Sequence, residues 1–80
     1  MSKTDSLPLT IRSSEVLGAT LAIRRYELGM TQTQVAELAE VSIRSLKQLE
    51  AGQTNAGIQA VLRVLYVLGL EFTIGTRTTI

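Results

Sequence analysis

The 80-residue sequence contains neither cysteine nor histidine. Without cysteine it can form no disulfide bond and no thiolate metal site. Without histidine it lacks the commonest general base and metal ligand. Its carboxylates are scattered over predicted helix surfaces and no glycine-rich phosphate loop is present, so we expect no catalytic residues, no metal, no cofactor and no small-molecule ligand.

Long apolar runs and aromatic side chains are also scarce. No run approaches the roughly 18 residues that cross a bilayer, and the N-terminus has no signal-peptide pattern, so we expect a cytoplasmic protein without a membrane partner. Two tyrosines and one phenylalanine are too few for a surface that stacks on single-stranded nucleic acid. The net charge of +1 is weak for a nucleic-acid binder. Any such function therefore depends on where the charges lie.

The distribution of apolar residues, proline and glycine divides the chain into three parts. Residues 1–12 contain Pro8 and no helical period, and we expect an N-terminal arm that is extended near residues 9–11 or disordered. Residues 13–69 form the predicted helical domain, and residues 70–80 a C-terminal strand and tail. A chain this short buries only about 60% of its unfolded surface. Dimerisation is a common remedy for so small a core.

Capping residues and glycines mark four helices in the central part. The expected helices run from Ser13 or Ser14 to Leu28, from Thr31 onward, from Ser42 to just before Gly52, and from an Asn55 cap to Leu68. Thr31 is followed three residues later by Gln34, the spacing of a capping box. The helices are therefore short and closely spaced.

Charged residues fall on two faces that we expect to point inward. The expected inward residues of the first three helices are Leu17, Leu21, Leu28, Val35, Leu38, Ala39, Leu46 and Leu49. Arg25 continues the inward stripe of the first helix, and Glu50 that of the third. A charge on an inward face needs a partner. We therefore predict a bidentate ion pair between Arg25 and Glu50.

The opposite side of the third helix carries Ile43, Arg44, Lys47 and Gln48. Two short helices joined by a tight turn form a helix-turn-helix, whose second helix lies in a DNA major groove. Cations, an amide and an apolar tip are the groups that read guanine edges, adenine edges and thymine methyls. The spacing alone is equally consistent with an ordinary solvated face.

The fourth helix is apolar on more than one side. This indicates that a second surface, such as another subunit, packs against the apolar side that the domain core leaves uncovered. Scattered surface apolar residues are the alternative. We expect its core stripe to be Ile58, Val61, Leu62, Leu65 and Leu68, with Val64, Tyr66 and Val67 off that stripe. The alternation in residues 70–74 predicts a strand, which must pair with residues 9–11 or with a second copy. The predicted homodimer interface is Val64, Val67, Leu70, Phe72 and Ile74.

Residues 17–69 resemble the Cro/C1-type (Xre) helix-turn-helix family. The resemblance lies in LG at 28–29, TQ at 31–32, VAELA at 35–39, VS at 41–42, LEAG at 49–52 and VLGL at 67–70. It implies an all-α, four-helix λ-repressor-like domain that regulates transcription, with a C-terminal strand pairing across a homodimer. In that family an arginine of the first helix pairs with the glutamate before the turn glycine, positions that Arg25 and Glu50 occupy here.

The resemblance also implies the DNA-binding residues: Gln32, Ser42, Ile43, Arg44, Lys47, Gln48, Thr54 and Asn55. The sequence departs from the family at three places. Glu40 stands where a glycine usually adopts a left-handed backbone, so we expect strain of about 1 kcal/mol there. The loop at 53–57 has no cation, although backbone amides at a helix N-terminus can hold a phosphate. Ile43 replaces a polar reader.

Within this family the two ends of the domain most resemble antitoxins of the HipB type. The resemblance rests on RSSEVLGATLAIRR at 12–25, and on LEFTI at 70–74 in place of a fifth helix. It implies a bacterial, nucleoid-associated autorepressor of a type II toxin–antitoxin operon. It would bind operator DNA and a HipA-type serine/threonine kinase toxin. A stand-alone or phage-type repressor, and a dimeric interaction module with weak DNA binding, are the alternatives.

Overall fold

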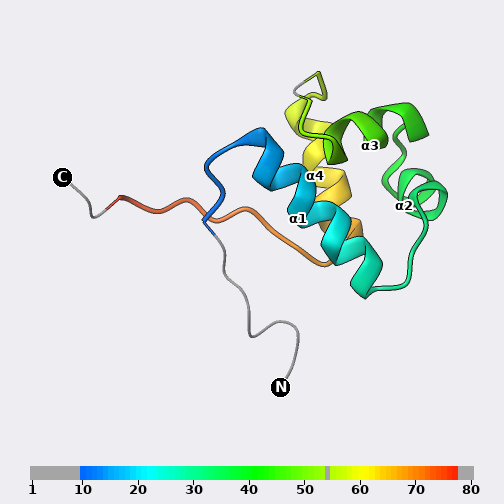
Figure 1. Cartoon of the computed structure of the whole chain (residues 1–80), viewed down its shortest axis with the longest axis horizontal. Helices are drawn as coiled ribbons and strands as arrows, with labels where there is room; N and C mark the ends of the chain where they lie inside the picture. The colour runs from blue at the N-terminus through cyan, green and yellow to red at the C-terminus, as the bar shows by residue number, and fades with distance from the viewer. Residues whose placement is uncertain (1–9, 54, 78–80) are drawn as a thin grey trace.

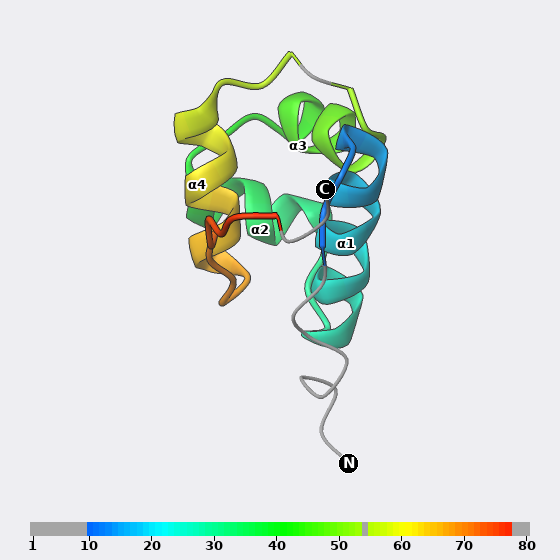
Figure 2. The same cartoon turned by 90° about the vertical axis from the view of Figure 1, so that its left-hand side faces the viewer.

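The computed structural model describes residues 10–53 and 55–77. These residues form four helices: α1 (Ser14–Glu27), α2 (Gln32–Ala39), α3 (Ile43–Glu50) and α4 (Ile58–Val67). Figure 1 shows the chain in order from blue α1 to yellow α4. In Figure 2, α1 and α4 stand on opposite sides, α2 crosses between them, and α3 lies above α2. The predicted four-helix, all-α fold is confirmed.

Local capping interactions explain where three of the helices begin. The Ser13 hydroxyl accepts a hydrogen bond from the Val16 amide at 3.1 Å. Thr31 and Gln34 form the predicted capping box, with distances of 3.0 Å and 2.8 Å. The prediction for α4 was wrong, because its N-cap is Gly57, with no side-chain cap, and not Asn55.

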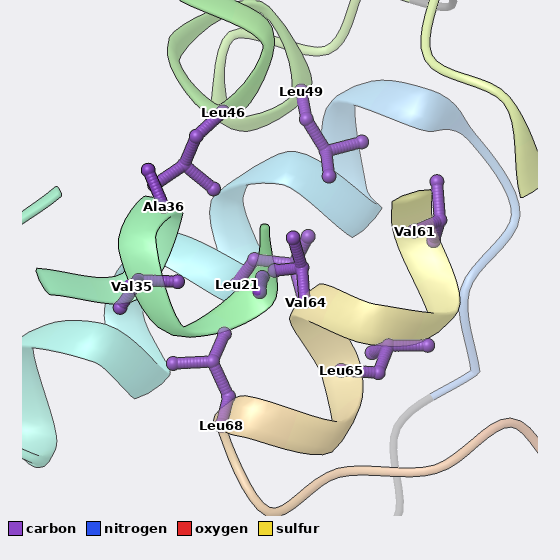
Figure 3. Packing of buried hydrophobic residues seen from close by; sticks show 10 residues of the cluster. Leu21, Val35, Ala36, Leu46, Leu49, Val61, Val64, Leu65 and Leu68 are labelled. Atoms are coloured by element: carbon purple, nitrogen blue, oxygen red, sulfur yellow. The ribbon is translucent and has the colours of Figure 1, made fainter. Parts of the chain in front are cut away.

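One cluster of apolar side chains, shown in Figure 3, contains residues from all four helices. Its largest fully buried members are Leu21, Leu46, Leu68, Val35 and Val64. On α2 the buried residues are Val35, Ala36 and Ala39. The two alanines are small, so α2 can lie close to both α3 and α4, against which it packs.

The predicted inward face of α4 was partly wrong. Ile58 and Leu62 are 61% and 45% exposed, whereas Val64 is only 1% exposed. Val64 therefore belongs to the core of the single chain and not to a dimer interface. Because α4 is apolar nearly all round, its sequence does not specify which side faces inward. Packing against the other helices decides it.

Two further leucines were predicted to be buried and are exposed. Leu28 is 43% exposed, because it is the C-cap at which α1 turns toward α2. Leu38 is 65% exposed, because Ala36 occupies the inward position instead. Leu17, in contrast, packs against the core as expected.

Arginines connect the end of one helix to the side of another. Arg24 of α1 donates from Nε to the Leu68 carbonyl at 2.9 Å, and Arg63 of α4 donates from Nε to the Ala39 carbonyl at 2.9 Å. The last carbonyls of a helix lack partners within that helix. These two arginines therefore satisfy the ends of α4 and α2 respectively.

The backbone of α1 lies directly against the end of α3 at Gly18. A Cβ atom at this position would lie 2.6 Å from the Glu50 carbonyl oxygen and would also collide with the Leu49 carbonyl. Only glycine permits this contact, because the colliding atoms are backbone. Gly18 is buried and was not singled out from the sequence.

The C-terminal segment runs from Gly69 away from α4. Residues 70–77 contain no helix or strand. The predicted strand is therefore not formed within the single chain, and residues 10–11 do not pair with it. A strand needs a neighbour to satisfy its backbone, so pairing with a second copy stays a prediction. Residues 1–9 of the expected arm lie outside the described residues, and so does Thr54. Among residues 10–53 and 55–77, none of the helices has the length and apolar character of a membrane span.

Candidate nucleic-acid interface

The turn between α2 and α3 is short because Glu40 adopts a left-handed backbone, with φ 59° and ψ 42°. This is the conformation predicted from the family's glycine. The Val41 amide donates to the Ala36 carbonyl at 3.0 Å, which closes the turn. The next residue, Ser42, caps α3 by accepting from the Ser45 amide at 2.9 Å. The two helices therefore form a helix-turn-helix.

The two sides of α3 differ as the sequence predicted. Leu46 and Leu49 are buried against the other helices. Arg44 and Lys47 are exposed, and Ile43 is 40% exposed at the start of the helix. Gln48 is half-buried at the edge of this side. The outward side thus presents two cations and an apolar tip to a ligand, with an amide beside them.

The position of α3 is set by a buried carboxylate. Glu50 accepts hydrogen bonds from Arg25 Nε at 2.8 Å and from Arg25 Nη2 at 3.0 Å. The two side chains are each 8% exposed, so this is the predicted bidentate pair in a largely buried setting. Hydrogen bonding to Glu50 raises the pKa of the Arg25 guanidinium. The remaining Arg25 nitrogen, Nη1, donates to the Met30 carbonyl at 3.1 Å.

Gln32 adds the second helix to this network. Its Nε2 atom donates to Glu50 Oε1 at 3.0 Å. One carboxylate of α3 is therefore held by α1 and α2 together. Among the described residues, no buried polar side-chain atom is left without a partner. The outward side of α3 is thus carried on a helix that side-chain hydrogen bonds link to both α1 and α2.

The remaining predicted contact residues lie around the two ends of α3. The Ser42 hydroxyl donates to Ser45 Oγ at 2.9 Å, so its hydrogen is used within the helix start. Gln53 and Asn55 are exposed in the loop after α3. Thr54 lies between them and outside the described residues. The loop brings no cation to this edge, because residues 53–57 are Gln-Thr-Asn-Ala-Gly.

Comparison with known proteins identifies the class to which this scaffold belongs. A model of the helix-turn-helix domain family matches residues 16–71. The chain is 38% identical over 64 residues to an uncharacterized HTH-type transcriptional regulator, y4mF, of Sinorhizobium fredii, and this match covers 80% of the chain and 84% of y4mF. The chain therefore belongs to the helix-turn-helix family, in its Cro/C1 (Xre) branch. It is a DNA-binding transcriptional regulator and not an enzyme.

Solved structures with the same fold include HipB. A HipB variant in complex with an O2 20mer superposes with a TM-score of 0.79 at 20% identity, covering 88% of this chain and 97% of that one. A chain of the HipA–HipB–O2–O3 complex superposes with a TM-score of 0.80 at 21% identity, and the match covers 90% of this chain and 100% of that one. The clp gene regulator ClgR from C. glutamicum superposes with a TM-score of 0.68 at 29% identity, and the match covers 81% of this chain and 83% of that one. The fold is thus HipB-like.

Proposed function

We propose that this chain is a sequence-specific autorepressor and the antitoxin of a type II toxin–antitoxin operon. In this proposal it binds operator DNA as a homodimer and restrains a HipA-type serine/threonine kinase toxin. The observation that carries DNA reading is the outward side of α3, where Arg44 and Lys47 project from a helix held by the buried Arg25–Glu50 pair. The antitoxin role is supported by the HipB-like fold and by the resemblance at both ends of the domain.

The outward side of α3 would read bases in the major groove. Arginine and lysine donate to the O6 and N7 atoms of guanine, and glutamine pairs with adenine. Ile43, exposed at the first turn, suits a thymine methyl. Arg44, Lys47 and the half-buried Gln48 would supply the polar contacts. Each good bidentate contact contributes about 1–3 kcal/mol of discrimination between bases.

Phosphate contacts would come from the flanks of α3. Gln32, at the start of α2, is positioned by its bond to Glu50, and backbone amides at a helix N-terminus favour anions. Exposed Gln53 and Asn55 follow α3. Since these side chains are neutral, Arg44 and Lys47 carry most of the charge on this surface. We therefore expect a shallow dependence of affinity on salt.

A homodimer would place two copies of α3 in successive major grooves, about one helical turn apart. Phe72 and Ile74 are 45% and 97% exposed in the single chain, and Val67 is half-buried. Leu70 already packs against the core, so it would act mainly by anchoring the tail. A strand formed by residues 70–74 of each copy would satisfy its backbone and cover these apolar side chains.

The decisive experiment is a fluorescence-anisotropy titration across a salt series. The purified protein is titrated into a duplex from upstream of its own gene and, separately, into a scrambled duplex. We expect at least about 10³-fold tighter binding to the native duplex. Arg44→Ala should cost about 1–3 kcal/mol on the native duplex and little on the scrambled one. Arg77→Ala, which removes an equal charge from the exposed tail, is the matched control.

Equal and weak binding to both duplexes would refute operator reading. A dimeric interaction module would then lead, a reading that the net charge of +1 and the neutral loop favour. The antitoxin role needs a separate test. The product of the neighbouring reading frame would be purified and mixed with this protein, and complex formation followed by calorimetry. Operator binding without a kinase partner would leave a stand-alone repressor.

A further inference from the structure

Arg63 makes a contact that DNA reading, as described so far, does not use. It lies on α4, and its Nε donates to the carbonyl of Ala39, the last residue of α2, at 2.9 Å. The last turn of α2 contains no basic residue of its own. Arg63 therefore supplies from another helix both the hydrogen bond and the positive charge that a helix C-terminus favours.

The residue after this carbonyl is the strained one. Glu40 has φ 59°, the only positive φ of a non-glycine residue among the described residues. A left-handed backbone costs an ordinary residue roughly 1–2 kcal/mol and persists only where its surroundings hold it. Only Glu40 and Val41 separate Ala39 from Ser42, the cap of α3. The path of these two residues therefore sets the angle at which α3 leaves α2.

Arg63 is well placed to hold this path. Its neighbour on α4, Val64, is 1% exposed in the core, so the α4 backbone is fixed at this point. Ala39, on α2, is likewise 1% exposed. The hydrogen bond thus runs from the exposed Arg63 side chain, on an α4 backbone that is anchored by packing, to the backbone carbonyl at the buried end of α2. Glu50 holds the far end of α3, and Arg63 acts at its near end.

We infer that Arg63 is a positioning residue for DNA reading: by holding the end of α2, it maintains the strained turn at Glu40 and so orients α3. Arg63 acts through α2 and does not itself touch DNA. The inference rests on the proposed reading of operator DNA by α3. Lysine should replace it only in part, since its single flexible ammonium lacks the planar geometry of the guanidinium.

The test compares Arg63→Gln and Arg63→Lys with Arg77→Gln, which removes the same charge from the exposed tail. Affinities are measured on the native and the scrambled duplex across a salt series. For Arg63→Gln we expect a loss of about tenfold on the native duplex, the order of one displaced base contact. Affinity for the scrambled duplex and the salt slope should match those of Arg77→Gln. Arg63→Lys should lie between wild type and Arg63→Gln.

A second comparison links Arg63 to the turn itself. Glu40→Gly removes the strain, so the turn no longer depends on the hydrogen bond from α4. In the Glu40→Gly background, Arg63→Gln should therefore lose much less specific affinity than in the wild-type background. Equal losses in the two backgrounds would overturn the inference. So would a salt slope that falls by about one, which would make Arg63 a phosphate contact.

Amide hydrogen exchange provides a measure that needs no DNA. In Arg63→Gln the Val41 amide, bonded to the Ala36 carbonyl, should exchange faster. The Met30 amide, bonded to the Arg25 carbonyl in the turn before α2, should be unchanged. If the wild type fails to distinguish the duplexes, the proposed function fails, while the exchange result still decides whether Arg63 holds the turn. Unchanged exchange at Val41 would refute that role, and Arg63→Lys supports the same comparison if Arg63→Gln does not fold.

Discussion

Glu50 is the residue whose replacement should most affect stability outside the apolar core. Its carboxylate accepts two hydrogen bonds from Arg25 and one from Gln32. Glu50→Ala would leave the Arg25 guanidinium with no carboxylate partner, holding only the Met30 carbonyl and the face of the Tyr26 ring at 4.7 Å, in a site where its side chain is 8% exposed. Leaving one charge of a buried pair without its partner costs about 3–5 kcal/mol.

This loss is large relative to the whole domain. Eighty residues at roughly 0.05–0.15 kcal/mol each correspond to a total stability of about 4–12 kcal/mol. Glu50→Ala should therefore remove about a quarter or more of the stability, or unfold the protein at room temperature. Arg25→Met combined with Glu50→Leu should recover most of it, because replacing both charges by apolar groups avoids burying an unpaired ion.

Urea denaturation followed by circular dichroism, at one fixed protein concentration, measures these losses. Glu27→Ala is the matched control, since Glu27 pairs with Arg24 at 3.5 Å with both side chains over 20% exposed. Such surface pairs contribute about 0–1 kcal/mol. If Glu50→Ala costs no more than Glu27→Ala, the buried network does not hold α3 in place, and the reasoning is wrong.

The pH dependence of this network follows from the direction of one pKa shift. Hydrogen bonding to Glu50 raises the pKa of Arg25 in the folded state. A raised pKa stabilises the fold at every pH below the unfolded value, and an arginine side chain stays protonated far above neutral pH. Arg25 should therefore contribute a constant amount throughout the neutral range and lose it only in strong alkali.

Three further changes test other parts of the structure. Glu40→Gly should stabilise the domain by about 1 kcal/mol and raise Tm by several degrees, because it relieves the left-handed strain; an unchanged or lower Tm would contradict this. Gly18→Ala should lower Tm markedly, because its Cβ would lie 2.6 Å from the Glu50 carbonyl, whereas Gly75→Ala, with open space around it, should not. Equal Tm values for these two variants would refute close packing of α1 on α3. Deleting residues 70–80 should weaken the homodimer in sedimentation analysis; a truncated chain that remains a tight dimer would place the interface on α4 alone.

Local sequence was enough to determine most helix ends. Thr31 and Gln34 form their capping box with atoms three residues apart, so no other part of the chain is involved. The left-handed backbone of Glu40 was expected from the resemblance to a family with glycine at this position, because a glutamate does not itself favour that conformation. Helical spacing also placed Arg25 and Glu50 on facing sides, and a buried charge without a partner is costly enough to imply the pair.

What local sequence could not decide was the side of a helix that faces inward when most of its sides are apolar. On α4 the helical spacing of apolar residues allows either the side with Ile58 and Leu62 or the side with Val64 to face inward. Packing against the other helices buries Val64 and leaves Ile58 and Leu62 exposed. The contacts of Arg63 with Ala39 and of Gly18 with the end of α3 join residues far apart in the chain. Such contacts depend on the distances between packed helices, and the spacing of apolar residues along the sequence does not specify these distances. The C-terminal tail shows the same dependence, because a strand forms only where another backbone completes its hydrogen bonds.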